Sequence, residues 1–251
     1  MIQRIKELYG YIVRAKDGDI GSVEDFYFDD QDWSVRYLIL DTGEWLDGRK
    51  VLLSPVALSS LDNTSQQIPT QLTREMVMNS PEIDVAKPVL RRKEIELHNY
   101  YQWPYYWGST SVSGIAPGNL LASYPLIELR EEMEEQAASP EEEDASNLRS
   151  TREVFGYRLH ARDGEIGQVK DFIIEDEAWN ILYMVVDTGG WLSGRKVLVS
   201  PNWVEQVSWL EKRVHIDLNR DTIQNSPEYD PSVPLDKTYE SRLYQHYGRE
   251  K

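Results

Sequence analysis

The sequence has no cysteine and only four histidines among its 251 residues. The lack of cysteine excludes disulfide bonds, a cysteine nucleophile, zinc fingers and cysteine-held iron–sulfur clusters. The histidines, His98, His160, His215 and His246, show no His-x-x-x-His spacing typical of a metal site. We interpret them as ordinary surface or half-buried side chains, and we expect neither a metal nor a cofactor.

Long hydrophobic runs are also missing. No stretch approaches the roughly 18 consecutive apolar residues that a membrane-spanning helix needs. Residues 1–13, MIQRIKELYGYIV, carry charges where a signal peptide needs an apolar core. We therefore expect a cytoplasmic protein that does not insert directly into a membrane.

Basic residues are scarce relative to acidic ones. The 27 Lys and Arg residues face 43 Asp and Glu residues, which gives a formal net charge of −16. Such a surface repels phosphate backbones, so nucleic-acid binding is disfavoured. Residues 127–144 alone hold nine acidic residues and one basic residue. This block indicates a solvated acidic linker, with docking of a basic partner as the alternative, and residues 126–136 are a candidate short amphipathic helix.

What the sequence does contain is an internal repeat with a constant offset. The motif DGDIG at residues 17–21 recurs as DGEIG at residues 163–167, which is 146 positions later. The segment DTGEWLDGRKVLLSP at residues 41–55 recurs at the same offset as DTGGWLSGRKVLVSP, residues 187–201. Two ungapped copies of about one hundred residues each imply two domains.

Within each copy, turn signals separate short runs of apolar, β-branched and aromatic residues. The Asp-Gly pairs favour tight hairpin turns, because glycine tolerates positive φ. Thr73 and Asn219 are expected to cap a short helix each. Alternation along residues 20–28 places Val23, Phe26 and Phe28 near a core. The pattern favours a small barrel or sandwich. The predicted strands of the first copy cover residues 11–16, 20–28, 35–40, 50–53, 56–60 and 67–72, with counterparts that include residues 204–209 and 213–218.

The ordered pattern G-Y-x-V, D-G-x-I-G-x-V, D-F and G-R-K-V-L-x-S-P resembles the PRC-barrel family. The second copy matches 146 positions higher, with Leu159 in place of Val13. Residues 91–108, RRKEIELHNYYQWPYYWG, resemble the tail of free-standing bacterial members. The matching residues of the first copy are Gly10, Tyr11, Val13, Asp17, Gly18, Ile20, Gly21, Val23, Asp25, Phe26, Gly48, Arg49, Lys50, Val51, Leu52 and Pro55.

The resemblance implies a mainly β fold of two small, mostly antiparallel PRC-type β-barrels with short helices. It covers residues 1–107 as the first repeat with its aromatic tail and residues 151–248 as the second. Residues 108–150 form the predicted flexible acidic linker. Because similar copies can pair about a twofold axis, we expect the tandem repeats to associate as a pseudo-dimer within one chain.

The family's members include the cytoplasmic part of the photosynthetic reaction-centre H subunit and the C-terminal domain of the ribosome-maturation factor RimM, which act by binding proteins. This sequence shows neither the membrane helix of the first nor the N-terminal domain of the second, so neither role transfers. The resemblance predicts a non-catalytic protein-binding scaffold with a protein partner of unknown identity. An accessory subunit of a membrane assembly is the alternative.

The motif Asp-Thr-Gly occurs at residues 41–43 and again at residues 187–189. Two-lobed aspartic proteases carry one such motif in each lobe, and their two carboxylates share a proton. Here Glu44 or Gly190 and then a tryptophan follow, where those enzymes have a small residue. We interpret the motif as a strand end in which Asp accepts turn amides and Gly takes positive φ, with the protease as a third hypothesis. We expect no enzyme.

The Gly-Arg-Lys turns are the second candidate for chemistry. An anion site is one interpretation, but no P-loop motif is present. A hairpin turn with solvated cations is the favoured one. Clustered aspartates at residues 29–32 and 17–19 lack the spacing of a calcium loop, so no metal is expected there. The candidate turn residues are Gly48, Arg49, Lys50, Gly194, Arg195 and Lys196.

Residues 100–108, YYQWPYYWG, hold six aromatic residues in nine positions. Tyr and Trp concentrate at protein interfaces because they combine a large rigid area with a polar group. One interpretation is that the rings close the barrel or cover a cleft between the copies. The other is a docking site for a partner, because the second copy carries only Tyr244 and Tyr247 near its end. The candidate partner-binding residues are Tyr100, Tyr101, Trp103, Tyr105, Tyr106 and Trp107.

Overall fold

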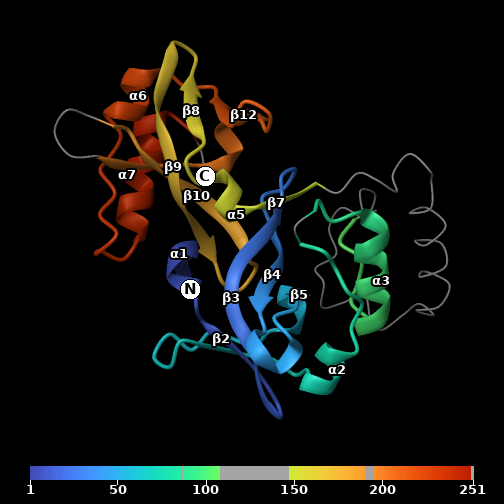
Figure 1. Cartoon of the computed structure of the whole chain (residues 1–251). Coiled ribbons are helices and arrows are strands. Elements are labelled where there is room, and N and C mark those ends of the chain that lie inside the picture. Colours follow the sequence, from blue (N-terminus) through green and yellow to red (C-terminus); the bar gives the residue numbers. More distant parts are fainter. Residues whose placement is uncertain (86, 108–146, 190–194, 250–251) are drawn as a thin grey trace, which may run out of the picture. The chain divides into compact units, whose positions relative to one another are not determined.

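The computed structural model describes residues 1–85, 87–107, 147–189 and 195–249 (Figure 1). The chain forms two compact units, one of Met1–Arg74 with Leu148–Lys251 and one of Glu75–Asn147. The predicted acidic block, the candidate helix at residues 126–136 and Gly194 lie outside the described residues. The domain boundaries proposed from the repeat, at 1–107, 108–150 and 151–248, stay a prediction.

The first copy forms a six-stranded sheet whose main path runs β5-β4-β3-β2-β6. Neighbouring strands are antiparallel, except that β2 and β6 run parallel. The long strand β3 is the middle strand of this path, between β4 and β2. The strands of the path are β2 (Ile12–Ala15), β3 (Gly18–Asp29), β4 (Val35–Asp41), β5 (Lys50–Leu53) and β6 (Gln67–Pro69).

The second copy forms a seven-stranded sheet with the path β11-β10-β9-β8-β13-β12. Again one pair, β8 with β13, is parallel. Among the described strands no pairing joins β11 to β12, so the path has two ends and no closed ring of hydrogen bonds. Its strands are β8 (Arg158–Ala161), β9 (Gly164–Glu175), β10 (Asn180–Asp187), β11 (Lys196–Val199), β12 (Val204–Ser208) and β13 (Arg213–Ile216).

Each copy gives its first strand to the sheet of the other copy. Strand β1 (Ile2–Arg4) pairs antiparallel with β9, and β7 (Leu148–Ser150) pairs antiparallel with β3. The two registers are equivalent at the 146-residue offset, since Ile2 faces Glu175 and Leu148 faces Asp29. The exchange joins the two sheets through main-chain hydrogen bonds.

Besides the exchanged strands, a second contact between the two copies shows that they are related by twofold symmetry. Ser34 forms a β-bridge with Asn180, which is its own counterpart in the second copy, and its Oγ donates to Asn180 Oδ1 at 2.9 Å. A residue that meets its own counterpart lies beside a twofold axis. The flanking bonds obey the same symmetry, with Val35 N on Trp179 O at 2.8 Å and Ile181 N on Trp33 O at 2.9 Å. The predicted pseudo-dimer is confirmed.

Aromatic rings form the core between the copies. Phe172 lies 5.7 Å from Phe28 and 6.3 Å from Trp33, measured between ring centroids. Its counterpart Phe26 lies 6.2 Å from Trp179. Full burial of such a side chain contributes about 1.5–3 kcal/mol. These rings and the exchanged strands hold both copies in one compact unit.

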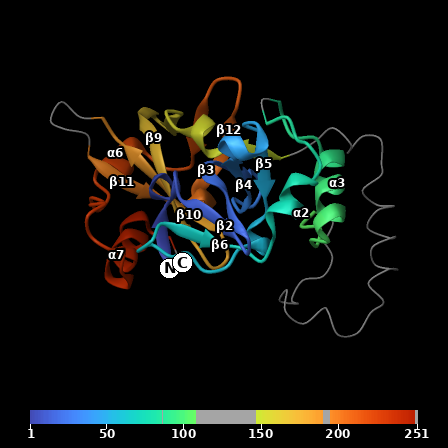
Figure 2. The same ribbon diagram turned by 60° about the horizontal axis from the view of Figure 1, so that its bottom comes forward.

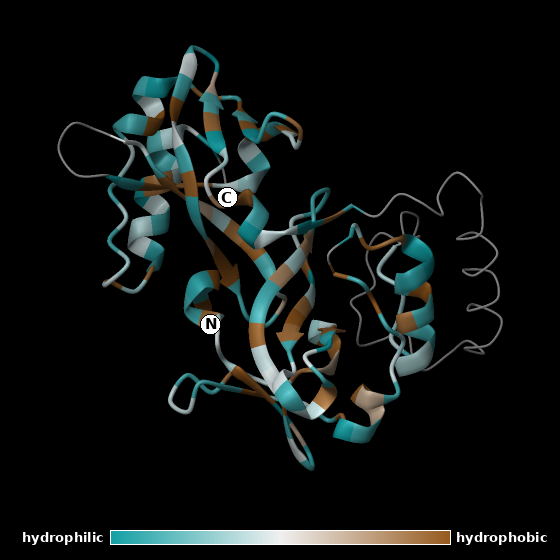
Figure 3. Ribbon diagram, in the orientation of Figure 1, coloured by the Kyte–Doolittle hydropathy of each residue, from teal (hydrophilic) through white to brown (hydrophobic). Residues whose placement is uncertain are grey.

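Apolar and polar residues both occur along β3 and β9 (Figure 3), and the second half of each strand is buried at successive positions, residues 25–29 and residues 171–174. Val23, Phe26 and Phe28 are buried, as predicted. Gly21 is required by close packing, because a Cβ at this position would lie 2.2 Å from the carbonyl oxygen of Asp41. Gly167 makes the same approach to Asp187. The DGxIG motif therefore lets β3 and β9 pass close to the next strand.

Short helices complete each copy. The helix α7 lies beside the second sheet (Figure 2). Two hydrogen bonds join them, since Tyr247 Oη donates to Leu198 O at 3.3 Å and Tyr183 Oη donates to Glu240 Oε1 at 3.1 Å. The helices are α1 (Ile5–Leu8), α2 (Arg74–Met78), α3 (Arg91–Tyr101), α5 (Thr151–Val154), α6 (Arg220–Gln224) and α7 (Lys237–Tyr247), with 3₁₀ turns η1 (Gly43–Leu46), η2 (Pro55–Ala57) and η4 (Pro201–Trp203).

The strand predicted over residues 56–60 is wrong. The chain forms η2 there and then a single bridge between Leu58 and Thr70. The later residue Asp62 turns the chain, because its Oδ1 accepts from Thr64 N at 2.9 Å and from Ser65 N at 3.2 Å. Such local bonds compete with a sheet ladder. The second copy lacks this aspartate turn and forms β12.

The cap predicted for Asn219 is also wrong, since its side chain makes no capping bond. Instead, Asp163 Oδ1 accepts from Arg220 N at 2.8 Å. The first copy repeats this contact, with Asp17 Oδ1 and Arg74 N at 2.8 Å. The aspartate of each Asp-Gly hairpin thus caps a helix 57 residues further along the chain.

Candidate functional site

The aromatic segment lies at the C-terminal end of α3 and directly after it. Gln102 takes a left-handed conformation with φ of 58° and ends the helix. Trp103 N then donates back to His98 O at 2.9 Å. This reversal is a common C-terminal helix motif. It folds residues 103–107 back against the helix.

His98 lies at the centre of this folded segment. It is only 2% exposed, so the interpretation of His98 as a surface or half-buried histidine is wrong. Its Nδ1 lies 2.9 Å from Pro104 O, and because a carbonyl only accepts, Nδ1 carries the proton. Four aromatic rings surround it within 4.8–6.0 Å between centroids, namely Trp103, Tyr105, Tyr106 and Trp107.

A charged pair on α3 holds the end of the segment. Arg91 and Glu94 form an ion pair at 2.9 Å, with side chains only 9% and 0% exposed. The guanidinium of Arg91 lies 4.3 Å from the Trp107 ring centroid, a cation–π contact worth up to about 2 kcal/mol when desolvated. Tyr106 Oη donates to Glu94 and accepts from Arg91. Burial, and then the charge of Glu94, raise the pKa of Tyr106, which therefore stays protonated.

The remaining rings differ in their exposure. Tyr100 is 38% exposed, and its Oη donates to Met76 O at 2.7 Å. Tyr105 is half-buried, and its Oη donates to Asn99 Oδ1 at 2.6 Å. Trp103 stacks on the buried Tyr101 with 4.3 Å between ring centroids. The structure therefore brings the predicted residues together on α3 and the turn after it, and their binding of a partner stays a prediction.

Three residues of this cluster escaped the sequence reasoning, namely Arg91, Glu94 and His98. The spacing of these three residues along the sequence could have revealed them. Positions separated by three and four residues lie on one face of a helix. An arginine, a glutamate and a histidine on one face, followed by an aromatic run, indicate that this face receives the run.

Both Asp-Thr-Gly motifs form turns. Gly43 N donates to Asp41 Oδ1 at 3.0 Å, and Gly189 N donates to Asp187 Oδ1 at the same distance. Both glycines have positive φ, of 61° and 54°. The turn interpretation is confirmed. Asp41 also pairs with Lys50 at 2.8 Å, and this bond together with the Gly43 N–H lowers the pKa of the carboxyl group.

Lys50 and Lys196 begin β5 and β11, the second strands of two antiparallel pairs, but the cations described there are not simply solvated. Lys50 Nζ lies between Glu24 at 2.6 Å and Asp41 at 2.8 Å. Arg195 Nη2 donates to Ser226 O at 2.5 Å. Gly48 has φ of 72°, which suits a glycine in the turn. Lys196 begins β11 and makes no ion pair within the described residues.

Two features are absent from the described part of the chain. No group of three or more His, Asp or Glu side chains is placed there to hold a metal ion. None of its helices is both long and apolar enough to span a bilayer.

The comparison with protein families agrees with the geometry. The model of the PRC-barrel domain matches residues 2–74 and residues 148–223, together more than half of the chain. The two matches coincide with the two symmetric copies and end at the short helices α2 and α6. No curated protein matches the chain. The chain therefore belongs to the PRC-barrel domain family, and it carries two copies of the domain.

Proposed function

We propose that the chain is a non-catalytic scaffold that binds a protein partner through the aromatic segment on its first copy. One observation carries the proposal. Helices α3 and α7 are counterparts in the repeat, but the residues that follow α3 are aromatic where their counterparts in residues 249–251 are not. Residues 249–251 have no aromatic side chain where the first copy has Trp103 and Tyr105. A repeat that only needed to complete its own fold would not require this addition.

The arrangement of the rings supports docking. Tyr100 is exposed, and Trp103 and Tyr105 are half-buried. Tyr100 and Tyr105 are already held by hydrogen bonds from their hydroxyl groups, and Trp103 is held by stacking. Side chains that are ordered before binding lose little conformational entropy when a partner arrives. A rigid surface rich in Tyr and Trp is typical of binding hot spots.

The test compares two matched variants. Tyr100 Oη donates to Met76 O, and the counterpart His246 contacts the counterpart carbonyl, Thr222 O, at 2.7 Å. Tyr100→Ala and His246→Ala therefore remove equivalent contacts between two helices in the two copies. We expect the double variant Tyr100→Ala, Tyr105→Ala to lose its partner in affinity capture from native lysate, and His246→Ala to retain it.

The captured partner is then purified and titrated by calorimetry. A fall in affinity of at least about tenfold in the aromatic variant supports the proposal, since a hot-spot residue contributes 1–2 kcal/mol or more. Equal affinity for the wild type and the aromatic variant would reject the segment as the docking site. A partner embedded in a membrane complex would identify the scaffold as an accessory subunit of that assembly.

The non-catalytic part of the proposal has its own test. Aspartic proteases need two carboxylates that share one proton, whereas Asp41 is paired with Lys50 and its pKa is lowered. We expect no peptide cleavage between about pH 3 and 7, the range in which such enzymes act. Acid-dependent cleavage that is lost in Asp41→Asn or Asp187→Asn would overturn this part.

A further inference from the structure

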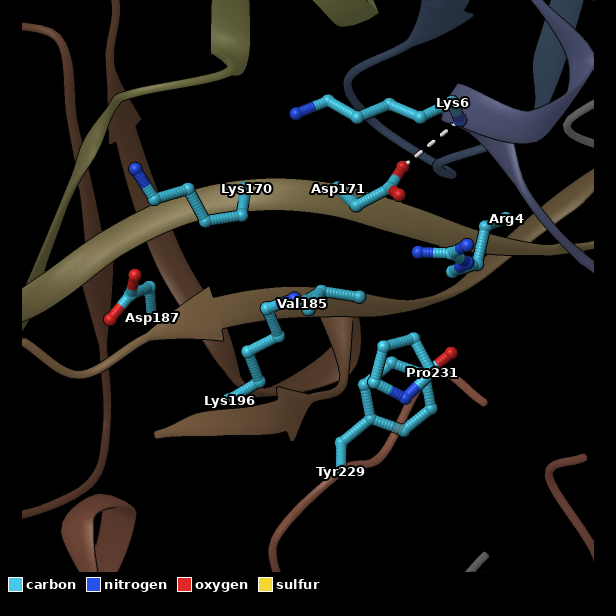
Figure 4. A pocket seen from close by; sticks show the side chains of 9 residues that line it. All are labelled: Arg4, Lys6, Lys170, Asp171, Val185, Asp187, Lys196, Tyr229 and Pro231. Atoms are coloured by element: carbon cyan, nitrogen blue, oxygen red, sulfur yellow. Dashed lines mark hydrogen bonds between the residues drawn. The ribbon is translucent and has the colours of Figure 1, made fainter. Parts of the chain in front are cut away.

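A cavity of about 220 Å³ lies in the first compact unit, between the exchanged N-terminal segment and the second sheet (Figure 4). Its walls come from β1, α1, β9, β10 and β11 and from the segment after α6. Four of its side chains are cationic and two are carboxylates. The lining residues are Arg4, Lys6, Lys170, Asp171, Val185, Asp187, Lys196, Tyr229 and Pro231.

Three of the cations lack a carboxylate partner. Arg4 pairs with Glu7, but Lys6, Lys170 and Lys196 make no ion pair within the described residues. Lys6 Nζ instead lies 4.3 Å from the ring centroid of Phe155. Ammonium groups that share one cavity repel each other. This arrangement is unexpected in a chain with a net charge of −16, which offers many carboxylates for pairing.

The first copy shows how the same position is neutralised. There Lys50, the counterpart of Lys196, is paired with both Glu24 and Asp41. At the 146-residue offset the counterpart of Glu24 is Lys170. The second copy therefore has an ammonium group, that of Lys170, where the first copy has the carboxylate that pairs with the lysine of the turn. The close ion pair of the first copy is therefore absent from the second, where Lys196 shares the cavity with Lys170 and acts at longer range on Asp230, whose pKa its charge helps to lower.

The carboxylates of the cavity do not restore the balance. Asp171 Oδ1 accepts from Lys6 N at 3.1 Å and from Phe172 N at 2.8 Å, so it fastens α1 to β9. Burial raises the pKa of Asp171, and the hydrogen bonds from Phe172 N and Lys6 N and the charges of Lys6 and Arg4 oppose this shift. Asp187 accepts from the turn amide of Gly189. Both carboxylates thus accept hydrogen bonds from backbone N–H groups around the cavity.

We propose that this cavity binds a small molecule that carries a phosphate group. The ammonium groups of Lys6, Lys170 and Lys196 neutralise the phosphate, and the side chains of Tyr229 and Pro231 contact the rest of the ligand. Lysine binds phosphate as a compact point charge with three donors. The volume is below the roughly 300–1,000 Å³ of pockets for drug-sized ligands, which favours a small anion.

The experiment is a calorimetric titration of the full chain with inorganic phosphate and with phenyl phosphate at constant ionic strength, since surface charges are screened by salt. Lys170→Glu is the central variant, because the first copy folds with Glu24 at this position. Lys16→Glu is the control, with the same change of charge at an exposed turn residue outside the cavity. We expect saturable binding to the wild type, at least about tenfold weaker binding to Lys170→Glu, and a change below about threefold for Lys16→Glu.

Three results would overturn the proposal: no saturable binding to the wild type, equal affinity for Lys170→Glu, or an equal loss in both variants. Vesicles that contain phosphatidic acid form a further arm. Binding to these vesicles without binding to either soluble phosphate would reject a soluble ligand. If Lys170→Glu does not fold, Lys196→Gln takes its place with an expected loss of at least about fivefold, and unchanged affinity in that variant also rejects the site.

Discussion

Lys50 in the first copy and Lys196 in the second begin equivalent strands, but their surroundings differ. Lys50 is neutralised by two carboxylates, whereas Lys196 lies in a cavity beside Lys170. A second difference follows the long helices, where only α3 carries an aromatic run. The exchanged strands and the Asp-Gly hairpins, in contrast, are equivalent in both copies. The two proposals rest on these differences, docking of a partner on the first copy and phosphate binding on the second.

The largest effect is expected at the core between the copies. Phe26 and Phe172 are counterparts, and both are fully buried. Because each ring packs on side chains of the other copy, we expect Phe26→Ala and Phe172→Ala to lower the free energy of unfolding by about 3–5 kcal/mol each. Urea denaturation followed by tryptophan fluorescence measures both. Two separate transitions, with only one shifted by each variant, would show that the copies unfold independently.

The next effect concerns the close approach of strands. A Cβ at Gly21 or Gly167 would lie 2.2 Å from a backbone oxygen, which cannot move as a flexible side chain does. We expect Gly21→Ala and Gly167→Ala to cost about 1–3 kcal/mol through overpacking. Gly167→Ala should cost more, because Gly167 also has φ of 149°. Thermal unfolding compares the two, and an unchanged Tm in either variant would contradict the steric explanation.

A smaller effect is expected at the helix caps. Asp17 and Asp163 each accept from the first amide of a short helix at 2.8 Å. Loss of an N-terminal cap costs about 1 kcal/mol. We expect Asp17→Ala and Asp163→Ala to destabilise the chain equally by this amount in chemical denaturation. A loss in one copy alone would mean that the caps are not equivalent in solution.

The smallest expected effect is a pH-dependent difference between the two Asp-Thr-Gly turns in their contribution to the free energy of unfolding. The folded pKa of Asp41 lies below its unfolded value near 3.9, because Lys50 and the Gly43 N–H favour the charged form. Its contribution is therefore present above about pH 4 and is lost as the pH falls through the folded pKa. We expect Asp41→Asn to cost less than about 1 kcal/mol at neutral pH and nothing in strong acid, because the pair is exposed.

Asp187→Asn is the matched control for this prediction. Asp187 makes no ion pair within the described residues, so its loss should cost less than the loss of Asp41. Stability curves from pH 2 to 7 measured by denaturant titration would compare them across the range in which carboxylates titrate. A larger loss of stability for Asp187→Asn than for Asp41→Asn would contradict the conclusion that only Asp41 forms a stabilising ion pair.

Much of the fold could be predicted from the sequence because the signals are local. Alternation placed Val23, Phe26 and Phe28 in the core, and the Asp-Gly pairs marked the hairpins. The strand predicted at residues 56–60 failed for a local reason as well, since Asp62 forms a side-chain turn that competes with the ladder. The functional candidates were harder to predict, because a cluster depends on contacts between distant segments.

The sequence by itself determined the two copies, their constant offset and the order of their strands, because periodicity and turn chemistry act over a few residues. Only the tertiary structure decided which copy each first strand joins, that Asp17 and Asp163 cap distant helices, and that His98 is buried among aromatic rings. It also brought Lys6, Lys170 and Lys196 into the lining of one cavity. Such contacts join residues far apart in the chain, and their energies depend on packing and burial that exist only once the sheets have formed.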